Sequence, residues 1–105
     1  MWGDREDQIG NVKFKTRGLQ AKLEYPPDER GKILEITKEC IAELFKKYGF
    51  GMLKKENIAE LESGQMVEIR ELGGMKIIVE ERQMKIAAKN ITSFEEFLTL
   101  VEQKL

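Results

Sequence analysis

Hydrophobic and polar side chains alternate through residues 11–25, with the period of a half-buried β-strand. The alternation changes phase across Arg17-Gly18. A two-residue turn at that point pairs Thr16 with Leu19 and keeps the apolar side chains on one face. The segment therefore predicts a β-hairpin, and the alternative is a single strand with a bulge at Gly18. In the hairpin, basic side chains share the opposite face: Lys13, Lys15, Arg17 and Lys22.

A long helix is predicted to begin at 26–29, where two prolines precede two acids, and to end near Tyr48. Its apolar residues cover roughly 180° of the helix surface, which is wider than the stripe of a helix that packs on one side only. We therefore expect this helix to lie on a sheet and to contact a second element. That element is either a short helix over 53–62 or another subunit.

The C-terminal third predicts a three-strand meander followed by a helix. A three-residue loop, Leu72-Gly73-Gly74, pairs Ile69 with Ile77 and keeps the apolar residues of the first two strands on one face. For the last helix, Ser93 and Glu96 have the spacing of a capping box, so Ser93 is the expected N-cap.

This order, β-β-α-(α)-β-β-β-α, predicts an α+β fold. We expect a single antiparallel sheet of about five strands with helices on one face. Residues 11–105 form one α+β domain in this interpretation, and residues 1–10 are a polar N-terminal tail.

The amino-acid composition limits the functions and cellular locations that we expect for this protein. The formal net charge is −1, from 18 basic and 19 acidic residues, so the bulk charge gives no support for nucleic-acid binding. A single cysteine and the lack of a membrane-length apolar run favour a reducing compartment, and we expect the cytoplasm. Much Lys and Glu with few amides is the compositional habit of thermophile proteins.

Candidate chemistry is sparse. The chain has no histidine and one cysteine, which excludes the usual nucleophilic triads and the Cys/His zinc sites. It also lacks a phosphate-binding P-loop. Cys40 falls on the apolar side of the long helix, where a buried structural thiol is expected. The sequence therefore predicts no catalytic residue, no metal site and no cofactor.

The leading functional hypothesis is a non-enzymatic protein–protein interaction or assembly module that forms a homodimer. The reason is a surplus of apolar residues on the long helix and on the outer face of the meander. The interface candidates are Leu34, Ile41, Phe45 and Ile78.

The alternative hypothesis is nucleic-acid binding by the basic sheet face of Lys13, Lys15, Arg17 and Lys22. The meander adds Lys76, Lys85 and Lys89 to this face. No aromatic residue occupies its outward positions, although sheets that bind single strands stack bases on aromatics. A third hypothesis is a small-ligand carrier or an enzyme.

Overall fold

The computed structural model describes residues 4–48, 67–72 and 75–105. Within these residues the chain forms six strands, two α-helices and one short 3-10 helix. In chain order they are β1 Arg5–Ile9, β2 Val12–Arg17, β3 Gln20–Glu24, η1 Pro27–Glu29, α1 Arg30–Tyr48, β4 Val67–Leu72, β5 Met75–Val79, β6 Gln83–Ala88 and α3 Ile91–Lys104.

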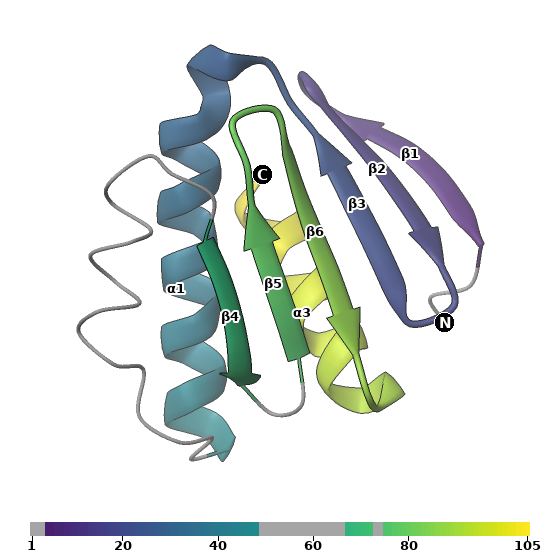
Figure 1. The fold of residues 1–105 in the computed structure, drawn as a ribbon, viewed down its shortest axis with the longest axis vertical. Helices are drawn as coiled ribbons and strands as arrows, with labels where there is room; N and C mark the ends of the chain where they lie inside the picture. Colours follow the sequence, from purple (N-terminus) through teal and green to yellow (C-terminus); the bar gives the residue numbers. More distant parts are fainter. Residues whose placement is uncertain (1–3, 49–66, 73–74) are drawn as a thin grey trace.

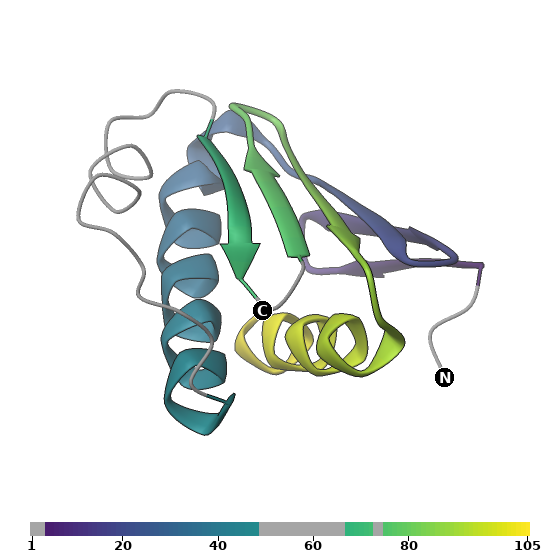
Figure 2. The same cartoon turned by 60° about the horizontal axis from the view of Figure 1, so that its bottom comes forward.

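The described strands form one sheet in the order β1-β2-β3-β6-β5-β4, and every neighbouring pair is antiparallel. Helices α1 and α3 lie on the same side of this sheet (Figures 1 and 2). The predicted fold class, an α+β domain built on one antiparallel sheet with helices on one face, is confirmed. The sheet has one strand more than expected.

The additional strand lies at the N-terminus. We predicted a polar tail over residues 1–10, but Arg5–Ile9 forms β1 and pairs with β2 along its length. The two strands are joined through Gly10 and Asn11, and Gly10 has a φ of 59°. A positive φ at the first position of a two-residue loop suits glycine and matches the twist of a hairpin. The Gly10-Asn11 turn is therefore the sequence signal for β1, because the residues of β1 themselves show no apolar alternation.

The second hairpin is confirmed, but its register differs from the prediction. Thr16 pairs with Ala21 rather than with Leu19, and the two-residue loop is Gly18-Leu19. Gly18 has a φ of 58°, so the glycine takes the first loop position as in the preceding hairpin. The register is displaced by two residues, which leaves every side chain on the predicted face.

Strands β4 and β5 pair in the expected register, with Ile69 opposite Ile77. The predicted three-residue loop is not formed, because Leu72 pairs with Met75 and leaves only residues 73–74 between the strands. The extra residue is absorbed by an irregularity between Ile69 and Leu72. This is the behaviour of a β-bulge, which accommodates one residue without changing the paired faces.

Both helices begin near the start signals that the sequence predicts. η1 has proline in its first turn and leads directly into α1, as predicted. α3 begins earlier than expected, because Asn90 is its N-cap and its side chain accepts a hydrogen bond from the Ser93 backbone N–H at 2.8 Å. Ser93 is therefore a buried residue of the first turn rather than the cap. The predicted helix over 53–62 lies outside the described residues.

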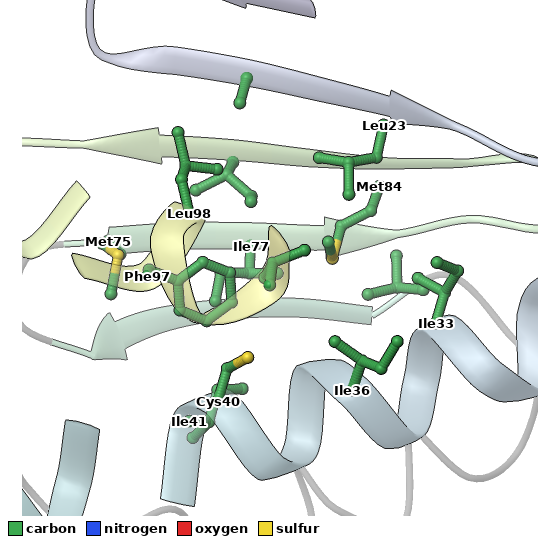
Figure 3. Packing of buried hydrophobic residues seen from close by; sticks show 14 of the residues in the cluster. Leu23, Ile33, Ile36, Cys40, Ile41, Met75, Ile77, Met84, Phe97 and Leu98 are labelled. Atoms are coloured by element: carbon green, nitrogen blue, oxygen red, sulfur yellow. The ribbon is translucent and has the colours of Figure 1, made fainter. Parts of the chain in front are cut away.

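The core lies between the sheet and the two helices. Figure 3 shows Phe97 of α3 beside Ile77 of the sheet, with Cys40 of α1 pointing into the same layer. All three side chains are fully buried. Leu34 and Ile41 also belong to this core, with 8% and 0% of their surfaces exposed. The broad apolar sector of α1 therefore supplies at least these two side chains to the interior of the chain.

Candidate functional site

The outer face of the sheet, opposite the helices, carries rows of side chains that run across the strands. Antiparallel pairing places directly opposed residues on the same face. One row crosses five strands from β1 to β5. It is formed by Glu6, Lys15, Lys22, Lys85 and Ile78.

The centre of this row consists of three lysines on adjacent strands. Lys15 of β2 lies opposite Lys22 of β3, and Lys22 lies opposite Lys85 of β6. All three are exposed. Like charges that are directly opposed across a sheet destabilise it. We call these three residues the lysine row, and its cost to folding makes it a candidate for a functional surface.

A second row lies two residues further along the strands. Arg17 is opposite Gln20, Gln20 is opposite Ala87, and Ala87 is opposite Lys76. Residues two apart in a strand are separated by roughly 7 Å. Arg17 and Lys76 therefore place two further cations beside the lysine row.

The two rows line a hollow of about 710 Å³ on the outer face. The lysine row, Arg17 and Lys76 all line it, while Ala87 and Ile78 contribute apolar surface. No aromatic residue is among its described lining residues. Asp4 and Glu6, at the N-terminal edge of the sheet, add two acidic side chains to the lining. The described face thus combines concave shape with an excess of positive charge.

Two of the lysines form solvent-exposed ion pairs on this face. The Lys22 Nζ lies 3.2 Å from a carboxylate oxygen of Glu24, and the Lys85 Nζ lies 3.7 Å from one of Glu80. The hydrogen bond and charge of Lys22 lower the pKa of the Glu24 carboxyl, and the charges of Lys15 and Lys13 act in the same direction. Three lysines of this face thus favour the ionised form of the Glu24 carboxyl.

The predicted basic face is thus partly assembled. Lys15, Arg17 and Lys22 come together at the hollow, whereas Lys13 lies opposite Glu24 and lines a separate depression. The sequence placed Lys76 and Lys85 on the same outer face, but it did not place them beside the β2–β3 hairpin. Their position depends on the pairing of β3 with β6, which joins strands that are distant in the chain.

The predicted protein interface is not assembled on one surface. Leu34 and Ile41 lie in the core of the chain, whereas the prediction placed them at an interface. They are buried because α1 packs its broad apolar sector inside the chain. Ile78 lies on the outer face, where it is half-buried and lines the hollow. The side chain of Phe45 lies outside the described part of the structure.

The described residues contain little that resembles an active site. Cys40 is fully buried, and burial raises the pKa of its thiol to about 12. Burial also raises the pKa of the Tyr25 hydroxyl to about 12, and that hydroxyl donates to the Glu80 carbonyl oxygen at 2.5 Å. Burial therefore favours the neutral form of both groups. Among the described residues, no cluster of three or more potential metal ligands is present.

Within the described residues, no helix has the length and apolar character needed to cross a membrane. Comparisons of the chain with protein-family models, with curated proteins and with solved structures find no match. The outer face of the sheet is therefore the candidate functional surface of this protein.

Proposed function

We propose that this protein binds nucleic acid through the outer face of its sheet. The observation that carries the proposal is the lysine row, in which Lys15, Lys22 and Lys85 lie side by side on three strands at the edge of a hollow. Opposed like charges oppose folding. A polyanionic ligand offsets that repulsion, because its negative phosphates neutralise the cations. The counterions that the nucleic acid releases add to the affinity.

The chemistry of the hollow favours a polyphosphate chain over a small metabolite. Small-ligand pockets are lined mainly by apolar and aromatic side chains, with few polar groups. This hollow also has apolar lining, but it carries more charge than such pockets do, through five outward basic residues among those described: Lys15, Arg17, Lys22, Lys76 and Lys85. The net charge of −1 is compatible with this role, because five of the 18 basic residues come together at the hollow. We place the binding activity in the cytoplasm, which agrees with a single cysteine buried as a thiol.

The experiment is a titration of labelled oligonucleotide by fluorescence anisotropy at several salt concentrations. If all five basic residues contact phosphates, the logarithm of the binding constant falls with the logarithm of salt concentration at a slope of up to about −4.5. The triple variant Lys15→Ala/Lys22→Ala/Lys85→Ala should reduce this slope by roughly 2 to 3 units.

A matched control removes the same charge from the other side of the molecule. Lys32, Lys38 and Lys46 lie on α1, away from the hollow. The triple alanine variant of these residues should bind with nearly the affinity of the wild type. Equal loss of affinity in both triple variants, or no binding by the wild type at about 50 mM salt, rejects the proposal.

Self-assembly is a second candidate function, favoured by Ile78. This residue is the large apolar side chain that the described outer face presents to the hollow. If Ile78 is part of a contact between two copies, the wild type is a dimer and Ile78→Glu is a folded monomer. Light scattering after size-exclusion chromatography measures both masses. A monomeric wild type, or a variant that remains dimeric, excludes Ile78 from such a contact.

A further inference from the structure

The lining of the hollow also bears on which form of nucleic acid it binds. Proteins that bind single strands stack successive bases on aromatic side chains, and each stacked base contributes roughly five- to hundredfold in affinity. Among the described lining residues the hollow has no Phe, Tyr or Trp. The floor residue Ala87, between Gln20 and Lys76, is too small to stack on a base. The described surface therefore offers cations for phosphates but no stacking platform for base faces.

The cations are arranged in two dimensions. The lysine row runs across the strands, with neighbouring strands about 4.8 Å apart. Arg17 and Lys76 lie in the second row, roughly 7 Å along the strands, at opposite sides of Gln20 and Ala87. A single strand offers one flexible line of phosphates. A duplex offers two fixed lines and about twice the charge per unit length.

From this arrangement we infer that the hollow takes double-stranded nucleic acid in preference to single strands, and that it contacts phosphates of both strands. The inference rests on the proposed function and specifies its ligand. The recognised chemistry is the double line of phosphates, which DNA and RNA duplexes share.

The test measures affinity for a short duplex and for each of its separate strands, in DNA and RNA versions, under identical salt conditions. Wild-type protein should bind at least one of the two duplexes about tenfold more tightly than its strands. The two versions distinguish a DNA ligand from an RNA ligand. If single strands bind as tightly as both duplexes, the inference is overturned while the proposed function stands. If no oligonucleotide binds, the proposed function itself fails.

A gain-of-function variant tests the reason for the preference. Ala87→Tyr adds an aromatic ring to the floor and should raise single-strand affinity by roughly tenfold, without a similar gain for the duplex. Ala87→Leu fills comparable space without a stacking surface and should give no such gain. Circular dichroism establishes that both variants fold. A similar gain with Leu, or no gain with a folded Tyr variant, contradicts the assignment of the missing stacking surface as the cause.

Discussion

Replacing the central residue of the lysine row should stabilise the folded protein. Lys22 has a like charge on each side, Lys15 on β2 and Lys85 on β6. We predict that Lys22→Thr raises the free energy of unfolding while it lowers the affinity for nucleic acid. Stability and affinity should change in opposite directions, because the charges that bind the ligand also destabilise the folded protein.

The magnitude follows from the register. Opposed side chains start about 5 Å apart, and flexible lysines can separate their ammonium groups to roughly 7 Å. Lys22 is 45% exposed, so the dielectric constant of water applies. The repulsion is then about 0.6 kcal/mol for each of the two pairs at low salt, or about 1 kcal/mol together. The exposed ion pair between Lys22 and Glu24 is lost in the variant and offsets part of this gain.

Lys13→Thr is the matched control. Lys13 lies on the same sheet face, but it is opposite Glu24 rather than another lysine. Both variants gain the same β-preference of threonine, so their difference isolates the charge environment. Urea unfolding followed by circular dichroism should show the Lys22 variant about 1 kcal/mol more stable than the Lys13 variant at ~10 mM salt. The difference should shrink at high salt because the charges are screened. If the Lys22 variant is equally or less stable at low salt, the lysines do not repel one another as the register implies.

Three further predictions concern the interior and its pH dependence. Phe97→Ala should reduce the free energy of unfolding by about 3–5 kcal/mol, since the ring is fully buried; a loss below 1 kcal/mol in urea unfolding would contradict this packing. Asn90→Ala removes the side-chain acceptor for the Ser93 N–H and should cost about 1 kcal/mol, whereas Asn90→Asp, measured in the same way, should retain most of the stability. Burial raises the pKa of Cys40 from 9.0 to about 12 and that of Tyr25 from 10.0 to about 12, so both favour the neutral, folded form. Their contribution to stability is complete below the unfolded pKa values and is lost as the pH rises towards 12. The thermal midpoint should therefore begin to fall above about pH 9, and it should fall less steeply in Cys40→Ala. An identical pH profile for the wild type and this variant would contradict the prediction.

Local patterns determined most of the elements. Alternation placed β2 and β3, and the proline-acid sequence placed the start of α1. These signals work because each depends on interactions within a few residues. The same locality explains two errors, in which Ser93 was chosen over Asn90 as the cap and the hairpin loop was set one residue early at Arg17-Gly18. In both cases neighbouring residues could satisfy the same local rule, and packing in the folded chain selected one of them.

In the candidate site, local sequence patterns determined less, and the tertiary structure determined more. Period-two alternation was sufficient to assign Lys15, Lys22 and Lys85 to the outer face of a sheet. Their contact across three strands was not encoded locally, because β3 and β6 are separated by about sixty residues of chain and pair only in the tertiary structure. The burial of Ile41 is a similar case. An apolar sector of a helix has the same sequence pattern whether its own chain or another subunit covers it. The sequence by itself determined which side chains share a face. The tertiary structure decided which faces meet and which cations become neighbours, because strand order and helix packing depend on contacts between distant segments.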